Sequence, residues 1–338
     1  MGGNIYCRLS QAYGFPGSKY LPKILEKCLT EREAEILLSL PGTVEEIASK
    51  LRVDAANVRF ILGELFRKGF VFYQSVGGKR RYSLINNLRD AIVINNRIDQ
   101  FGEEFLDLWA RMYDEEASRA FDAAGSEARV IPVHQTIEPG TEILPYETAF
   151  GLLDKAEAIA VMRCPCRITN RKCDNPLETC ISLNEVAKYV LERGVGRKLT
   201  RQEACSLLHQ CEDAGLIHQV GNGSLGVSWI CNCCTCCCVY LRAQMISGRK
   251  YATVRSRYRA TVDLRLCDGC ALCLERCHFG AVAMVNSKPV VDEEKCFGCG
   301  LCASRCPTRA INLVQIREPE HIPTREAEAL FSPIPTSL

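Results

Sequence analysis

Eight cysteines near the C-terminus fall into two sets of four with the same spacing, and this pattern constrains the chain more than any other feature. The first set follows C-x2-C-x2-C-x3-C, and the second repeats it 29 residues later: Cys267, Cys270, Cys273 and Cys277, then Cys296, Cys299, Cys302 and Cys306. Ala281-Val282 and Ala310-Ile311 repeat at the same offset. Three thiolates spaced two residues apart can wrap one face of an iron–sulfur cube. Zinc or disulfides are the alternative, and the repeated spacing disfavours both.

Residues 260–316 therefore resemble a bacterial-type 2[4Fe–4S] ferredoxin, in which the fourth Cys of each run ligates the other cluster. The resemblance implies two [4Fe–4S] clusters with crossed ligand sets. One set is Cys267, Cys270, Cys273 and Cys306, and the other is Cys296, Cys299, Cys302 and Cys277. The second run ends Cys306-Pro307, as in the family. The first ends Cys277-His278, a departure that leaves ligation intact and can tune the potential.

The apolar content of 47% is normal for a folded protein, and we expect an α+β fold with several domains. A chain of 338 residues suits two or three domains. No apolar run of 18 residues or secretory signal is visible, so we expect no membrane span and a cytoplasmic protein. The 22 cysteines are clustered, which favours reduced thiolates that bind metal over disulfides. The net charge of +2 is too small to argue for nucleic acid by itself.

The N-terminal region carries clear helix and hairpin signals. Thr30-x-x-Glu33 and Thr43-x-x-Glu46 predict two capped helices. Asp54 opens a longer helix that Gly69 ends, with an apolar stripe of Val58, Ile61, Leu62, Leu65 and Phe66. Residues 70–74 and 80–84 predict two strands joined by Gly77-Gly78. Residues 29–84 resemble winged-helix regulators of the MarR or ArsR kind, in which the second helix of the turn enters the major groove.

The resemblance leaves two roles open for this region. Its basic side chains offer phosphate contacts: Arg52, Arg59, Arg67, Lys68, Lys79, Arg80 and Arg81. The expected recognition helix has only Asn57, Arg59 and Glu64 to read bases, which is a thin surface for that purpose. We therefore favour a module that docks a protein partner or forms a homodimer, with nucleic acid as the less favoured partner.

Residues 96–145 are expected to form a helical connector and an extended, proline-rich linker. Phe101, Phe105, Leu108, Trp109 and Met112 give an apolar face within 98–124. The full expected division is 1–95 winged-helix-like, 96–145 connector, 146–245 Cys-rich metal-binding domain, 246–316 ferredoxin domain and 317–338 a loosely ordered, proline-rich tail.

The middle region holds ten further cysteines in two groups, candidate ligands for metal. They are Cys164, Cys166, Cys173 and Cys180, followed by Cys231, Cys233, Cys234, Cys236, Cys237 and Cys238. Ten thiols exceed what one four-coordinate metal can use. They predict one or two further [4Fe–4S] or zinc centres. Cys211 is interpreted as a core residue, Cys205 as a weak ligand candidate, and Cys7 and Cys28 as thiols without a functional role, since free Cys is often buried.

Residues 160–316 resemble an uncharacterised bacterial family of 4Fe–4S dicluster proteins, in which a CxCR…C…C segment and a CNCCxCCC segment precede the ferredoxin repeat. Between the two segments, Ser182-x-x-Glu185 and Thr200-x-x-Glu203 suggest capped helices, and residues 216–230 a hairpin. We expect a reduced winged-helix-like scaffold there. The basic stretch 242–259 is interpreted as packed around cluster charge, with a docking surface as the alternative.

The sequence predicts an iron–sulfur protein that relays single electrons between a donor and a partner oxidoreductase. Four cysteines per cube leave no iron open to substrate, which favours a carrier or electron-input subunit over a stand-alone enzyme, and no catalytic residue is assigned. Two alternatives remain open: a redox- or iron-responsive winged-helix transcription regulator, and a reductase that uses the Cys-rich cluster.

Overall fold

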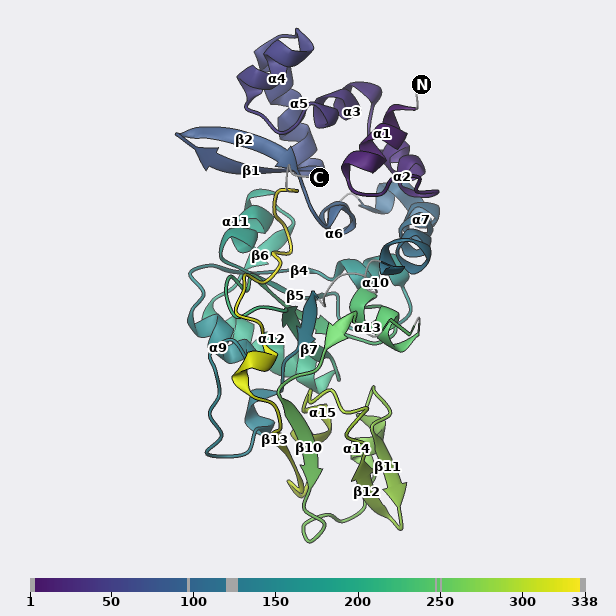
Figure 1. Ribbon diagram of the computed structural model, residues 1–338, viewed down its shortest axis with the longest axis vertical. Helices are drawn as coiled ribbons and strands as arrows, with labels where there is room; N and C mark the ends of the chain where they lie inside the picture. Colours follow the sequence, from purple (N-terminus) through teal and green to yellow (C-terminus); the bar gives the residue numbers. More distant parts are fainter. Residues whose placement is uncertain (1–3, 96–97, 120–126, 247, 250, 335–338) are drawn as a thin grey trace.

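The computed structural model describes residues 4–95, 98–119, 127–246, 248–249 and 251–334 of the chain. Three regions follow one another down its long axis (Figure 1). Helices and a hairpin lie at one end, a seven-stranded sheet lies in the middle, and two small hairpin-like sheets with the ferredoxin cysteines lie at the other end.

The N-terminal region consists of five helices followed by a hairpin. They are α1 (Ile5–Ala12), α2 (Leu21–Cys28), α3 (Glu31–Leu38), α4 (Val44–Leu51), α5 (Ala55–Lys68), β1 (Val71–Val76) and β2 (Lys79–Leu84). Both predicted capping boxes form at the starts of α3 and α4. Asp54 caps α5, and Gly69 ends it in the left-handed conformation. The predicted order of helices and hairpin in this region is therefore confirmed.

A helical connector packs beneath these elements and turns toward the sheet. It comprises α6 (Leu88–Val93), the short 3-10 segments Ile98–Phe101 and Ala117–Arg119, and α7 (Gly102–Glu115). Phe105, Trp109 and Met112 are buried, as the predicted apolar face requires, because they recur on one side of α7. The predicted helical stretch continues to residue 124, and residues 120–124 lie outside the described part of the chain.

The central sheet has the strand order β6-β4-β5-β8-β7-β3-β9. Its strands are β3 (Ala128–Val130), β4 (Ile159–Arg163), β5 (Glu178–Leu183), β6 (Gly196–Lys198), β7 (Ile217–Gly221), β8 (Trp229–Cys233) and β9 (Thr253–Val254). The helices around it are α9 (Ala149–Asp154), α10 (Pro165–Asn170), α11 (Asn184–Glu192), α12 (Arg201–Asp213) and α13 (Val239–Met245), with a 3-10 turn at His134–Thr136.

This sheet corrects two expectations for the middle region. The scaffold is a seven-stranded sheet and not a reduced winged helix, and it takes strands from both sides of residues 146–245. Ser182 does not cap a helix, because it lies buried in β5, and α11 starts after Leu183 without a side-chain cap. The predicted β7–β8 hairpin is confirmed, as is the capping box of Thr200 and Glu203 on α12.

The C-terminal region has the two-fold repeat that the sequence predicts. The strands β10 (Tyr258–Val262) and β13 (Ile311–Gln315) pair antiparallel, and β11 (Val282–Val285) pairs with β12 (Lys288–Val291). One short helix follows the second cysteine of each run, α14 (Leu272–Glu275) and α15 (Leu301–Ser304). These helices again differ in position by 29 residues, so the sequence repeat is also a structural repeat.

The tail is not loosely ordered over its described part. After a 3-10 turn at Pro319–His321 it runs back along the sheet to the N-terminal region, as the yellow trace in Figure 1 shows. The indole N–H of Trp229 donates to the carbonyl of Glu328 at 2.9 Å, and Asn86 and Ser332 exchange hydrogen bonds. Phe331 is 1% exposed and its ring lies 5.3 Å from that of Tyr189. The tail therefore ties the two ends of the molecule together.

Replacing Phe331 with Ala should detach this tail. The loss of a buried aromatic ring and the cavity left behind are expected to cost about 3–5 kcal/mol. Limited proteolysis should then cut the tail several-fold faster than in the wild type. Ile316→Ala, at a side chain that is 40% exposed, serves as the control and should leave the rate unchanged. Equal rates for Phe331→Ala and wild type would contradict the described packing.

Candidate iron–sulfur and metal centres

Two small cavities in the C-terminal region each have four cysteines in their walls. Site A is lined by Cys267, Cys270, Cys273 and Cys306. Site B is lined by Cys277, Cys296, Cys299 and Cys302. The fold thus assembles each set from both runs, with one cysteine crossing over. These are the two sets that the ferredoxin resemblance implies.

The backbone around sites A and B repeats along with the cysteines. The amide N–H of Ala281 donates to Cys277 Sγ at 3.2 Å, and that of Ala310 donates to Cys306 Sγ at 3.3 Å. Such donors stabilise negative charge on the sulfur. Gly269 and Gly298 occupy equivalent left-handed positions, where a side chain would meet the carbonyl of Ser287 or of Tyr258. Both loops can therefore follow the same close path around a cluster.

The two sites differ in exposure. Cys270 of site A is exposed, whereas the wall of site B includes the rings of Phe279 and Phe297, which stack on each other with centroids 4.2 Å apart. Burial raises the pKa of Cys299 to about 12. A bare thiolate is thus disfavoured at site B, and a bound metal would supply the positive charge that removes the proton.

A third group of thiols lies beside the central sheet. Cys173, Cys234, Cys236 and Cys237, here called site C, have sulfur atoms that all lie within 4.8 Å of one another. Cys173 Sγ is 3.7 Å from Cys234 Sγ and 3.8 Å from Cys237 Sγ. A metal–sulfur bond of about 2.3 Å gives a tetrahedron with edges of about 3.8 Å. Site C therefore has the dimensions of a single tetrahedral ion with four thiolates.

Sites A and B have a different spacing. Within the described ranges, no other three His, Cys, Asp or Glu ligand atoms approach one another as closely as those of site C. A cubane binds its thiolates through four different iron atoms, which holds the sulfurs farther apart than one ion does. The wider spacing at A and B fits cubanes, and the tight spacing at site C fits one ion.

The thiols of site C include one with strong thiolate character. The pKa of Cys234 is lowered to about 4. A hydrogen bond from Cys237 and the nearby positive charge of Arg167 lower it, and they outweigh burial, which acts in the opposite direction. The thiolate is the form that binds metal. The amide of Asn175 also donates to Cys173 Sγ at 3.3 Å, which helps to orient the sulfur.

The remaining six cysteines of the middle region form a closed ring of contacts on one face of the sheet. In ring order they are Cys164, Cys166, Cys238, Cys233, Cys231 and Cys180, and the thiol of each contacts the thiols of its two neighbours. We call this group the six-thiol ring.

The structure therefore regroups the ten cysteines that the sequence arranges in two runs. Cys173 leaves the first run and joins three members of the second, while Cys231, Cys233 and Cys238 join the first. Cys211 is buried in the core beside site C, as predicted. Cys205 packs against a separate apolar cluster with no other cysteine, so the structure does not support it as a ligand.

Apolar contacts connect the centres in series. Site A and site B share one buried cluster that contains Cys273, Cys296 and Leu313. A second cluster joins Cys277 and Cys299 of site B to Cys233 and Cys238 of the six-thiol ring, with Phe279, Phe297 and Leu301 between them. Arg167 lies between the ring and site C and donates to the carbonyl of Asn232 at 2.6 Å. The order is site A, site B, six-thiol ring and site C.

The basic stretch 242–259 is largely engaged within the molecule. Arg257 and Glu147 form an ion pair of 2.8 Å, and both side chains are 2% exposed. Arg242 is buried, pairs with Asp114 at 2.7 Å and donates to the carbonyl of Cys236. These two arginines are therefore structural and are not available to a docking partner.

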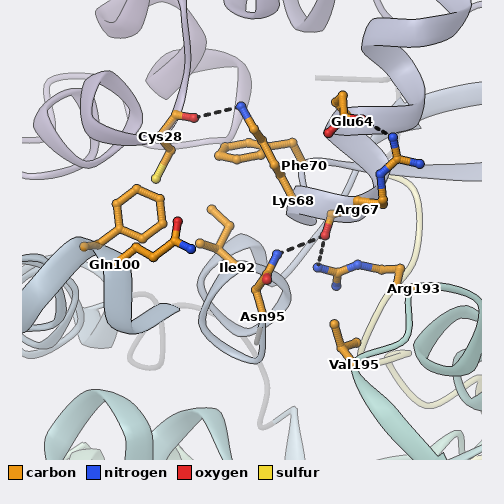
Figure 2. Close-up of a pocket in the computed structure, with 11 residues that line it drawn as sticks. Cys28, Glu64, Arg67, Lys68, Phe70, Ile92, Asn95, Gln100, Arg193 and Val195 are labelled. Carbon is orange, nitrogen blue, oxygen red and sulfur yellow. Dashed lines mark hydrogen bonds and ion pairs between the residues drawn. The ribbon is translucent and has the colours of Figure 1, made fainter. Parts of the chain in front are cut away.

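A cavity of about 390 Å³ between the N-terminal helices and the central region lies apart from these thiol groups (Figure 2). Arg193 and Asn95 both donate to the carbonyl of Arg67 on its wall. The thiol in the lining of this cavity belongs to Cys28. Burial raises the pKa of this thiol to about 12. Nothing in its lining suggests redox chemistry.

Comparison with known families agrees with the geometry at the C-terminus. Residues 289–312 match the 4Fe-4S binding domain, a segment that includes the second cysteine run. The search of curated proteins and the search of solved structures find no match. The chain thus contains an iron–sulfur domain that binds a 4Fe–4S cluster and has the capability for electron transfer. Among the described residues, no helix is both long and apolar enough to cross a bilayer.

Site C yields a direct test. Cys234→Ala should remove one metal ion per chain, because three thiolates leave a tetrahedral ion incompletely bound. Elemental analysis of the anaerobically purified full-length protein measures this loss, and Cys205→Ala is the matched control with unchanged metal content. A loss of about four iron atoms, with no change in zinc, would assign site C to a cubane instead.

Proposed function

We propose that this protein relays single electrons through a series of metal–thiolate centres, with two [4Fe–4S] clusters at sites A and B. The observation that carries the proposal is the assembly of two four-cysteine cavities, each taking one ligand from the other run. Each cubane would be fully ligated, which leaves no iron for substrate and favours a carrier or electron-input subunit over an enzyme.

The residues of this chain would tune the two clusters differently. Site A has an exposed ligand, Cys270, whereas site B is shielded by Phe279 and Phe297. Solvent exposure and hydrogen bonds to sulfur are the main protein levers on cluster potential. Arg276, beside Cys299 and Cys302, adds positive charge near site B. We therefore expect the two clusters to have distinct potentials.

Electrons would enter or leave at site A. Its surroundings carry exposed apolar side chains, among them Leu264, Leu266 and Leu274. An apolar surface of this kind suits transient contact with a redox partner protein. Site B and the six-thiol ring follow inward from site A, joined by the buried clusters described above. The direction of flow depends on the partner's potential.

For the N-terminal region we propose association with a protein partner or a second copy of the chain. On α5, the helix expected to read DNA, Phe60 is 67% exposed, an apolar group that does not read base edges. Arg59 pairs with Glu45, and Arg81 pairs with Glu46, so acidic side chains offset part of the positive charge on this face. The transcription regulator is therefore a weaker proposal than the electron carrier. The reductase is also weaker, because fully ligated cubanes leave no iron for substrate.

Cys270→Ala should remove the cluster at site A and destabilise the C-terminal region, because metal binding contributes to folding in so small a unit. Wild-type protein, purified and reconstituted without air, should hold at least about eight iron atoms from two cubanes, and the variant about four fewer. Iron and sulfide assays measure both. About four iron atoms or fewer in the wild type would rule out the two-cluster proposal.

A DNA-binding experiment separates the alternatives for the N-terminal region. We expect weak duplex binding without sequence preference at physiological salt. Electrophoretic mobility shift with the upstream region of its own operon measures this. A sequence-specific shift that Arg59→Ala abolishes would favour the regulator instead.

A further inference from the structure

The six-thiol ring is built by the register of the central sheet. Cys231 and Cys233 alternate with Asn232 along β8 and therefore point to the same face. The pairing of Ile181 with Ile230 on β5 and β8 continues to place Cys180 opposite Cys231. The strand β4 lies on the other side of β5 and leads directly into Cys164.

The remaining two thiols close the ring from above the sheet. Cys166 lies in the first turn of α10, and Cys238 immediately precedes α13. Four of the six side chains are buried, and Cys166 and Cys231 are half-buried. Thiols pack as small apolar groups, but packing alone gives no reason to gather six of them from three strands and two helices.

The spacing of the ring excludes the simplest occupants. The described residues contain no three of these sulfurs within 4.8 Å of one another, so the ring does not form a tetrahedral pocket like site C. A cubane takes one protein thiolate on each of four irons, which would leave two ring cysteines without metal. Six converging thiols therefore fit a larger metal–sulfide unit.

A buried arginine from the N-terminal side faces this ring. Arg89 on α6 is 1% exposed and donates from Nη2 to Cys166 Sγ at 3.4 Å. Its Nε donates to Asp90 at 2.6 Å, and the guanidinium stacks on Tyr113 at 4.1 Å. The Nη1 atom is buried and has no hydrogen-bond partner among the described residues. Buried donors in native proteins nearly always have an acceptor, so Nη1 points to a ligand beside Cys166.

A second donor touches the ring from the sheet. The amide of Gln219 on β7, 0% exposed, lies 3.9 Å from Cys238 Sγ. Arg167 is also buried against the ring, next to Cys164 and Cys180. Arg89 and Arg167 supply positive charge, and together with the amide of Gln219 they supply hydrogen-bond donors. Such groups offset the negative charge that the six ring thiolates would carry once metal is bound.

We propose that the six-thiol ring binds one polynuclear iron–sulfide cluster, larger than a cubane, with all six cysteines as ligands and with Arg89 as a hydrogen-bond donor to it. The six thiols lose their protons as iron and inorganic sulfide bind. This inference rests on the proposed iron–sulfur function and extends it, because it places a further electron-accepting centre next to site B. Arg89 would also couple that centre to the N-terminal region.

The test uses full-length protein reconstituted without air from ⁵⁷Fe(II) and sulfide, and examined by Mössbauer spectroscopy. Six single variants each replace one ring cysteine with Ser. We expect every one of them to remove or alter the same spectral component, with more than about four iron atoms in it. Cys211→Ser, at a buried thiol outside the ring, is the matched control and should leave that component unchanged.

Three outcomes separate this inference from its rivals. If two of the six variants leave the component unchanged, the ring holds a cubane and the inference is wrong. If the ring binds zinc and no iron, the inference is wrong as well. Cys299→Ser should remove the site B component alone, so that failure at sites A and B and failure at the ring remain distinguishable.

Arg89→Lys gives a second readout that does not depend on replacing a ligand. The ring component should persist, because no ligand is lost, while its midpoint potential shifts to a lower value. A donor to the cluster stabilises the additional negative charge of the reduced state, and lysine lacks the planar fork that reaches two acceptors. An unchanged potential would mean that Arg89 only packs against Tyr113 and does not donate to a cluster.

Discussion

The proposed bond between cysteine thiolates and metal is the interaction on which the rest of this structure depends. Eighteen cysteines line sites A, B and C and the six-thiol ring, and most of them are wholly or partly buried. The crowded thiols hydrogen-bond to one another, and the contact between Cys164 and Cys166 raises the pKa of the first and lowers the pKa of the second. Bound metal would replace the thiol protons and would contribute binding energy to folding, which small sheets like those of the C-terminal region rarely supply by themselves.

The fold arranges the four thiol sites in a series, and the tail and the N-terminal region enclose the inner part of that series. Sites A and B share a buried cluster, and site B shares another with the six-thiol ring. The tail runs back past the central sheet to Asn86, three residues before Arg89. The N-terminal region is thus held against the six-thiol ring, the third site of the series, while Cys270 of site A, the first site, is exposed.

Local sequence signals predicted the local structure well. The Thr30 and Thr43 capping boxes, the Asp54 cap and the Gly69 stop all mark real helix ends, because each acts through backbone groups within a few residues. The crossed cysteine sets of sites A and B were implied by the ferredoxin resemblance, which rests on the repeated cysteine spacing. In contrast, β4 and β5 were missed, since a short apolar run such as residues 159–163 does not distinguish a buried strand from a helix.

The regrouping of the middle cysteines was not predictable from spacing. Cys231 faces Cys180 because of the register of β5 against β8, and a shift of one residue would reverse the face of every side chain on the strand. Cys173 reaches Cys234 because it lies in the loop between α10 and β5, whose path depends on tertiary packing. Arg89 had no sequence signal, because a single arginine in a helix is usually a surface group.

The most direct test of the relay is the magnetic interaction between its centres. Electron paramagnetic resonance of the fully reduced, anaerobically prepared protein should give a spectrum broadened by coupling between neighbouring clusters. Loss of site B through Cys299→Ser should remove that coupling and leave the sharper, isolated signals of site A and of the six-thiol ring. A wild-type spectrum that is the simple sum of uncoupled clusters, unchanged in shape by this substitution, would contradict a series of adjacent centres.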